Sequence, residues 1–221
     1  MPSAWSFKLI TRKVMSEIAD TFERRGSMYA RIQGDQVHGI SFQWYREEYT
    51  INVAFHYAFL PSFNEVLDDK ELHAPLQKFR IIDCLFNARL ARFKSPITDS
   101  WTVVDEDDAR TTRALIERVR AAIQVLDKYA SLFGRPEDFL SQYPASKLFS
   151  RIDESEDPWA INKWIHCGNP DWSPDSLRLI RFLKILSERN GDHASAQLYH
   201  KSYNKLVYLF DLENEGIANE D

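Results

Sequence analysis

Between residues 28 and 104, long stretches of the chain alternate apolar and polar residues, and this period of two constrains the fold most. In the clearest stretch, Tyr49 to Phe59, every second residue is large and apolar. Successive side chains of a β-strand point to opposite faces of a sheet, so this alternation indicates strands with one apolar face. The same pattern predicts further strands at 28–33, 37–44, 80–92 and 101–104.

Short polar turns separate the predicted strands. Gly34–Asp35 follows the first strand, and Arg46–Glu48 precedes the strand that begins at Tyr49. Short turns join antiparallel neighbours, whereas parallel strands need a long crossover. The sequence therefore predicts an antiparallel β-meander of about five strands.

Two long amphipathic helices are predicted to flank the strands. The first spans about Ser3 to Arg25 and is expected to stop at Gly26, and the second opens at 105–108 and ends at Gly134. In both, apolar residues recur every three or four positions, which places them on one helix face. Carboxylates at 105–108 suit a helix N-terminus. The predicted fold class is α+β, with both helices packed on the apolar face of the sheet.

The chain changes character after residue 135, so we predict two domains, an α+β domain at 1–135 and an acidic helical module at 136–221. Asn190–Asp192 is a tight turn that predicts a closing helical hairpin. Residues 144–157 are expected to be irregular, and the tail from Glu213 is expected to fray. Helices are predicted at 136–142, 158–167, 174–189 and 192–212.

Several landmarks of the first domain resemble an uncharacterised bacterial family, domain-of-unknown-function family 4304. They are the helix ending in 22–26, the strand 49–53, Cys84 followed by Arg89–Leu90, and Trp101 before 104–105. The resemblance covers about residues 5–135. It implies a helix–meander–helix fold, and the family carries no established activity or catalytic residue to transfer.

Charge is distributed unevenly along the 221 residues, whose net charge is −5. Residues 1–134 carry 18 Lys and Arg against 18 Asp and Glu, whereas residues 135–221 carry 10 against 15. The basic footprint of a nucleic-acid-binding protein is therefore absent. No stretch approaches the ~20 apolar residues of a membrane span, and the N-terminus does not read as a secretory signal. With two cysteines and no disulfide framework, the sequence predicts a cytoplasmic protein.

The common catalytic motifs are missing from the sequence. There is no glycine-rich dinucleotide or phosphate loop, no zinc-protease helix, no serine nucleophile elbow and no C-x-x-C pair. We therefore predict no cofactor and no metal site, because His193 and His200 lack a third ligand. The roles of Cys84 and Cys167 stay open between small buried hydrophobe and reactive thiol.

One candidate site follows from the strand period. Polar residues of the predicted strands are expected to share the sheet face opposite the apolar one, and His56 beside Asp83 would form an acid–base pair. The other interpretation is a solvated face, since a sheet covered on one side shows polar residues on the other. The candidate binding residues of this face are Asn52, His56, Asp83, Asn87 and Arg89.

A second candidate site lies in the helical module, where an acidic run is followed by tryptophans. Acidic side chains attract basic partners, and aromatic side chains anchor protein interfaces. The other interpretation is a solvated loop, with tryptophans that attach the module to the rest of the chain. The candidate residues are Asp153, Glu154, Glu156, Trp159 and Trp164.

Taken together, these patterns predict a non-enzymatic cytoplasmic protein-binding domain. Its specific form is a toxin-neutralising immunity protein, whose acidic and aromatic surface covers a basic partner. The alternative is an enzyme of an unlisted class, with its site on the polar sheet face around His56. The sequence leaves the oligomeric state and the identity of any partner or substrate open.

Overall fold

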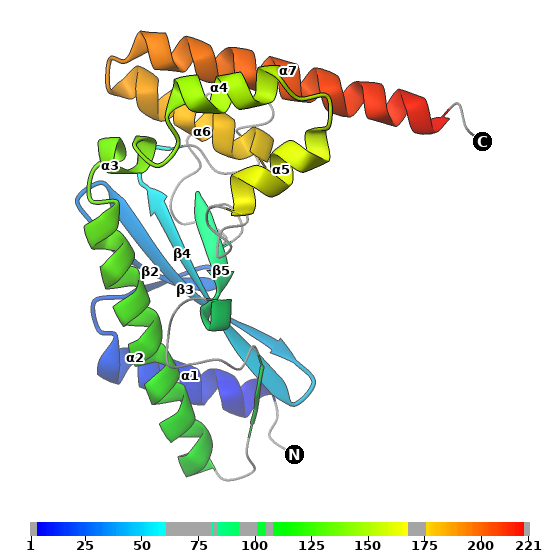
Figure 1. Cartoon of the computed structure of the whole chain (residues 1–221). Coiled ribbons are helices and arrows are strands. Elements are labelled where there is room, and N and C mark those ends of the chain that lie inside the picture. The colour runs from blue at the N-terminus through cyan, green and yellow to red at the C-terminus, as the bar shows by residue number, and fades with distance from the viewer. Residues whose placement is uncertain are drawn as a thin grey trace. The chain divides into compact units, whose positions relative to one another are not determined.

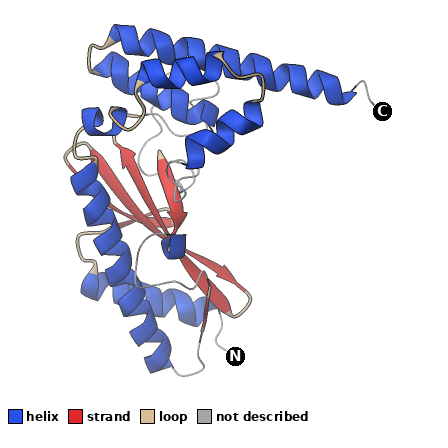
Figure 2. Cartoon of the chain, in the orientation of Figure 1, coloured by secondary structure: helices blue, strands red, loops and turns tan. Residues whose placement is uncertain are grey.

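The structure is a computed structural model that describes residues 4–60, 81, 84–92, 101–104, 108–167 and 176–218. It has an α+β fold with an antiparallel meander sheet, which confirms the predicted fold class (Figures 1 and 2). Contacts divide the described residues into two compact units, one before Leu132 and one from Leu132 onward. The sequence predicts this boundary after residue 135. Each unit is described by itself below.

The first unit is built around the sheet. Strands β1 to β5 follow one another in sheet order, each antiparallel to the next. The short β6 pairs with the first two residues of β4, and β5 pairs with Asn52–Phe55 of the same strand. The strands are β1 (Glu23–Arg25), β2 (Met28–Gln33), β3 (Gln36–Tyr45), β4 (Glu48–Tyr57), β5 (Phe86–Arg89) and β6 (Thr102–Val103).

Two-residue turns set the register of the sheet. Gln33 pairs with Gln36 across Gly34–Asp35, and Gly34 has a φ of 57°. Glycine enters this left-handed region without the steric cost of a Cβ atom. As predicted, Ile51, Val53 and Phe55 lie on one face of β4, because side chains alternate along a strand.

Helices α1 (Ala4–Ile18) and α2 (Asp108–Leu132) pack on that face (Figure 1). Phe7 of α1 contacts the rings of Phe42, Trp44 and Tyr49, with centroid distances of 6.4, 4.9 and 4.8 Å. Because aromatic burial removes a large apolar area from water, this contact is a main part of the first core.

The opposite face of the sheet holds a second core among the described residues. Its buried members come from β2, β3 and β4 and from Cys84, which precedes β5. Ala58 and Ile81 pack against them. The sheet therefore buries apolar side chains on both faces, and only part of the second face is polar. The buried members are Met28, Ala30, Val37, Ala54 and Cys84.

The first predicted helix is seven residues too long. Helix α1 ends at Ile18, and Glu23–Arg25 form strand β1 instead. Gly26, with a φ of 60°, lies in the turn that returns the chain to β2. Glycine marks a left-handed position both after a helix and in a hairpin, so the sequence signal was compatible with either.

The strand predicted at 80–92 is shorter in the structure. Strand β5 spans Phe86–Arg89, and the 3₁₀ helix η4 (Leu90–Arg92) follows it. Buried residues continue on both sides of β5, because Leu85 and Leu90 are 0% and 2% exposed. Apolar content therefore reports burial here rather than strand length.

The second unit is helical. It contains α3 (Pro136–Leu140), α4 (Ala145–Asp153), α5 (Pro158–Cys167), α6 (Ser176–Arg189) and α7 (His193–Ala218). Helices α6 and α7 form the predicted hairpin through Gly191, whose φ is 74°. Asp192 accepts a hydrogen bond from the backbone N–H of Ser195, which caps α7. Tyr199 of α7 donates to the carbonyl oxygen of Tyr143 at 2.6 Å.

Two predictions for this unit were wrong. Residues 145–153 form helix α4 and are not irregular, because Ala145, Leu148 and Ile152 recur at helical spacing and are buried on one face. Helix α7 also continues through Glu213 to Ala218. Among the described helices, none is both long and apolar enough to span a membrane.

Candidate functional site

The structure brings together three of the five residues predicted on the sheet face. Asn52 lies directly opposite Arg89, and Asn87 lies opposite Ala54, the next residue of β4 on the same face. The side chains of Asn52, Asn87 and Arg89 are half-buried. Strand period alone predicts this grouping correctly. Asp83 lies outside the described residues.

His56 shares this face but is not part of an open polar surface, contrary to the prediction. It is 0% exposed. Its Nε2 is 3.2 Å from the carbonyl oxygen of Leu60, and its Nδ1 accepts the backbone N–H of Leu85 at 2.9 Å. Both ring nitrogens are therefore engaged with backbone groups. This histidine fixes the chain after β4 and before β5.

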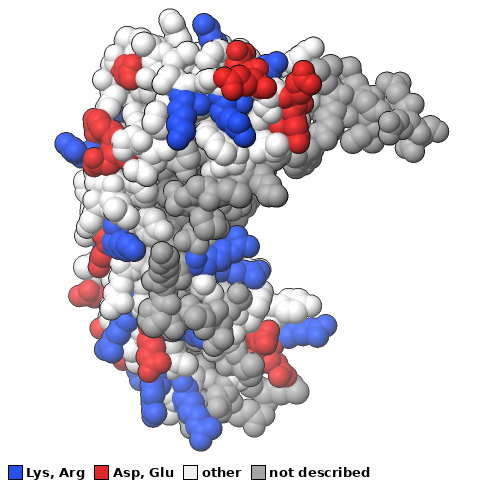
Figure 3. All heavy atoms as spheres, in the orientation of Figure 1, with Lys and Arg blue, Asp and Glu red and all other residues white. Residues whose placement is uncertain are grey.

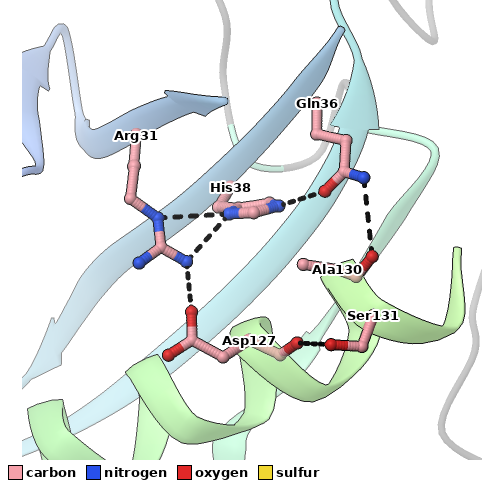
Figure 4. Close-up of polar contacts among 6 residues, drawn as sticks. All are labelled: Arg31, Gln36, His38, Asp127, Ala130 and Ser131. Atoms are coloured by element: carbon pink, nitrogen blue, oxygen red, sulfur yellow. Dashed lines mark hydrogen bonds and ion pairs between the residues drawn. The ribbon is translucent and has the colours of Figure 1, made fainter. Parts of the chain in front are cut away.

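A polar network centred on the buried Arg31 and His38 lies on the other face of the sheet (Figure 4). Arg31 of β2 donates to Nδ1 of His38 on β3, from Nε at 3.2 Å, and to Oδ1 of Asp127 on α2. Nε2 of His38 is 2.9 Å from Oε1 of Gln36, whose Nε2 donates to the carbonyl oxygen of Ala130 at 3.5 Å. The network ties α2 to two strands.

The network keeps His38 neutral. The pKa of His38 is lowered from 6.5 to about 4, mainly by burial and then by the adjacent positive charge of Arg31, while Asp127 opposes the shift. Since Nδ1 accepts from Arg31, the proton belongs on Nε2, where it is donated to Gln36. The ring also stacks on Phe55 at 5.7 Å between centroids. A ring held in this way is a structural element and not a proton carrier for a substrate.

Neither Arg31 nor His38 was among the residues predicted for a site, although the sequence carries the signal. The turn at Gly34–Asp35 pairs Gln33 with Gln36, so two residues further along each strand Arg31 must face His38. The register of this turn therefore predicts the pairing of Arg31 with His38. Their partner Asp127 lies 89 positions after His38 in the chain, and strand period carries no information about such a contact.

The acidic candidate residues of the second unit lie at the turn between α4 and α5. Asp153, Glu154 and Glu156 are exposed. Glu154 accepts a hydrogen bond from the hydroxyl of Ser150 at 2.8 Å. Asp157 accepts the backbone N–H of Ala160 at 3.0 Å and thus caps α5. Asp157 therefore has a structural role, Glu154 is exposed but bonded to Ser150, and Asp153 and Glu156 are exposed.

A cavity of about 390 Å³ lies between the start of α4 and the C-terminal half of α5, at the ends of these helices away from the turn, and its described lining is mostly apolar. Tyr143, Leu148, Trp164 and Ile165 contribute apolar surface, and Lys147 lies at the same cavity. Trp164 is half-buried, with the guanidinium carbon of Arg151 at 6.0 Å from its ring centroid. We call this cavity the α4–α5 groove. Trp159 lies in α5, but its side chain lies outside the described residues.

The charges around the α4–α5 groove are mixed. Lys147 and Arg151 lie along α4, and the acidic turn lies at its C-terminal end, so the sign of the charge changes along one short helix. Figure 3 likewise shows acidic and basic side chains interspersed over the face that it presents. Nine helical residues span roughly 13 Å, so both charges and the groove can engage one partner segment.

No protein-family model, curated protein or solved structure matches this chain. The resemblance to domain-of-unknown-function family 4304 therefore stays a prediction. Among the residues that the structure describes, no group of three or more His, Cys, Asp or Glu side chains is placed to hold a metal ion.

Proposed function

We propose that this protein binds another protein through the α4–α5 groove and the acidic turn that joins the two helices. The observation that carries the proposal is the half-buried Trp164 in an apolar groove at the start of α4, together with three exposed carboxylates at the other end of the same helix. The partner presents an apolar side chain to the groove and basic side chains to the turn. Neutralisation of a basic toxin in the cytoplasm is the specific form of this function.

Physical chemistry assigns the two features different roles in binding. Exposed charges at the edge of an interface accelerate encounter, and their effect is screened beyond a Debye length of ~8 Å in physiological salt. A tryptophan that a partner buries slows dissociation, because its apolar area must be returned to water. Asp153, Glu154 and Glu156 therefore steer association, whereas Trp164 sets the lifetime of the complex.

Catalysis at His56 has no comparable support. General acid–base chemistry requires a side-chain nitrogen within hydrogen-bond reach of a substrate proton. His56 is completely buried, and its two nitrogens face the carbonyl oxygen of Leu60 and the N–H of Leu85. Its geometry favours a structural role, so protein binding is the function that we propose.

Site-specific photocrosslinking in the native host tests the location of the proposed interface. A photoreactive amino acid replaces the exposed Lys147 of the groove, and the matched control replaces Lys201, an exposed lysine of α7. We expect a discrete protein adduct at position 147 that is absent at position 201. The same adducts at both positions, or none at position 147, would refute the proposed interface.

Binding kinetics of the crosslinked protein then test the two roles. The variant Asp153→Asn/Glu154→Gln/Glu156→Gln should associate more slowly and with less salt dependence, while Trp164→Ala should dissociate faster. Asp157 is left in place because it caps α5. If the triple variant and Trp164→Ala both bind with unchanged rates, the crosslinked protein is not held by this surface.

A further inference from the structure

Four side chains at one end of the sheet form a continuous series of contacts, in which two neighbouring rings lie between two arginines. Tyr45 ends β3, and Arg46 follows it in the turn to β4. The guanidinium carbon of Arg46 lies 5.3 Å from the ring centroid of Tyr45, and that of Arg89 lies 5.0 Å from the ring centroid of Trp101. The two ring centroids are 6.2 Å apart. We call these four residues the Arg–aromatic stack.

The stack is accessible and is held by the sheet. Tyr45 is 57% exposed, and Arg46 is exposed beside it, so a partner can reach this part of the stack. The backbone N–H of Val104 donates to the carbonyl oxygen of Glu47 at 2.8 Å, which anchors the turn against the residue after β6. Arg89 is held by its pairing with Asn52.

The backbone at Arg46 adds an independent observation. Its φ of 54° lies in the left-handed region, where it is the only described residue other than glycine. Residues other than Gly, Asn and Asp enter this region at a steric cost, and such strain gathers at binding and catalytic sites. The strained conformation places an arginine where a two-residue hairpin turn favours glycine.

We propose that the Arg–aromatic stack is a second binding surface, which takes an acidic segment of a partner protein with carboxylates next to an apolar side chain. Stacking on a ring covers one face of a guanidinium and leaves its N–H edge directed outward, where it pairs with a carboxylate in a bidentate manner. The exposed ring of Tyr45 supplies the apolar contact. Tyr, Trp and Arg are also the residue types enriched in interface hot spots.

Charge favours a protein segment over a single-stranded nucleic acid. Aromatic rings and arginines also bind single strands, but such proteins line a groove with basic residues to follow the phosphates. Residues 1–134 carry equal numbers of basic and acidic side chains, and Glu47 and Glu48 lie directly after Arg46. A continuous polyanion would meet both carboxylates, whereas a peptide with separate acidic residues can avoid them.

Selection from a random 12-residue peptide library against the full-length protein tests this proposal. The library is first depleted on the Arg46→Ala/Arg89→Ala variant, so that retained sequences require the stack. We expect enrichment of Asp or Glu next to Phe, Tyr, Trp or Leu. Enrichment of basic sequences, or no enrichment over the depleted library, would overturn the proposal.

Calorimetric titration of a selected peptide measures the contribution of single residues. Arg89→Ala should weaken binding by about tenfold or more, because a charge-assisted hydrogen bond is lost. Arg89→Lys, which keeps the charge but not the planar fork, should also weaken it. The matched control Arg113→Ala removes an exposed arginine of α2 and should bind as the wild type does.

Three results of this titration would count against the stack. An equal loss in Arg113→Ala would show a nonspecific charge effect. Full binding by Arg89→Lys would show that stacking is irrelevant. Tighter binding of a 12-nucleotide single-stranded oligonucleotide than of the peptide would assign the surface to nucleic acid. Thermal melting of each variant separates loss of binding from loss of folding.

Discussion

Arg31 and His38 face each other across β2 and β3, with Nη2 of the arginine 3.0 Å and Nε 3.2 Å from Nδ1 of the histidine. A guanidinium has donors only, so the histidine nitrogen that faces it must be the acceptor. Protonation of His38 would place two positive groups in contact inside the core. The pair therefore links folding of the first unit to pH.

We predict that His38 makes the protein less stable as the pH falls from about 6.5 to about 4. In the unfolded chain His38 titrates near 6.5, and in the folded protein its pKa is about 4. Between these values the unfolded state binds more protons, so the free energy of unfolding decreases with decreasing pH. The full effect is about 3 kcal/mol. Urea denaturation at a series of pH values measures it.

The variant His38→Gln is the control for this titration, since glutamine does not ionise. Its absolute stability is expected to be lower, because the stacking on Phe55 is lost. The informative quantity is the slope of unfolding free energy against pH, which should be shallower than in the wild type. Equal slopes would assign the acid sensitivity to other groups.

We predict that His56→Ala destabilises the protein by about 3 kcal/mol, similar to the ~3–5 kcal/mol expected for Phe55→Ala. The alanine leaves a cavity and removes the acceptor of the Leu85 N–H, which is then buried without its partner. The polar pattern alone predicts a much smaller loss, because it places His56 on a solvated face. Chemical denaturation of both variants separates the two expectations.

His56→Gln is the matched control, because its amide carries both a donor nitrogen and an acceptor oxygen. It should recover part of the lost stability. If His56→Ala costs less than ~1 kcal/mol, the histidine contributes little to the core, and the contacts with Leu60 and Leu85 are not stabilising.

The sheet was predictable because strand period and turn residues are local signals. Met28–Gln33 is a strand in both sequence and structure, and the alternation from Tyr49 onward identifies the apolar face of β4. The end of α1 was not predictable in the same way. Whether Glu23–Arg25 continue a helix or form an edge strand depends on pairing with Met28–Ala30, and a tertiary contact overrides the local pattern there.

The candidate sites show the same division between local and distant information. The grouping of Asn52 with Arg89 follows from strand period. The burial of His56 does not, because its contacts are with the backbone of Leu60 and Leu85, which lie outside the strand. In the second unit, the acidic run of 153–157 favoured an irregular segment, although Leu148 and Ile152 have the apolar spacing of a helix. The α4–α5 groove could not be predicted for that reason, although one of its residues, Trp164, was.

We predict that Tyr199→Phe destabilises the helical unit by about 1 kcal/mol, the usual net value of one hydrogen bond, and by more if the carbonyl stays buried. The Tyr199 hydroxyl donates to the carbonyl oxygen of Tyr143 at 2.6 Å, which holds the start of α4 against α7. The exposed Tyr208→Phe is the control and should be neutral. Thermal unfolding followed by circular dichroism measures both, and equal effects would show that the bond is not stabilising.

The last prediction concerns the strained turn at Arg46. Glycine adopts a φ of 54° without a Cβ clash, whereas alanine at this position keeps the clash. Both Arg46→Gly and Arg46→Ala remove the contact of the guanidinium with Tyr45. Arg46→Gly should therefore be more stable than Arg46→Ala by about 1 kcal/mol, while both lose the acidic peptide that we propose for the Arg–aromatic stack. Urea denaturation and calorimetric titration measure the two properties separately. Equal stability of the two variants would show that the turn stores no strain, and retained peptide binding would show that Arg46 does not serve the site.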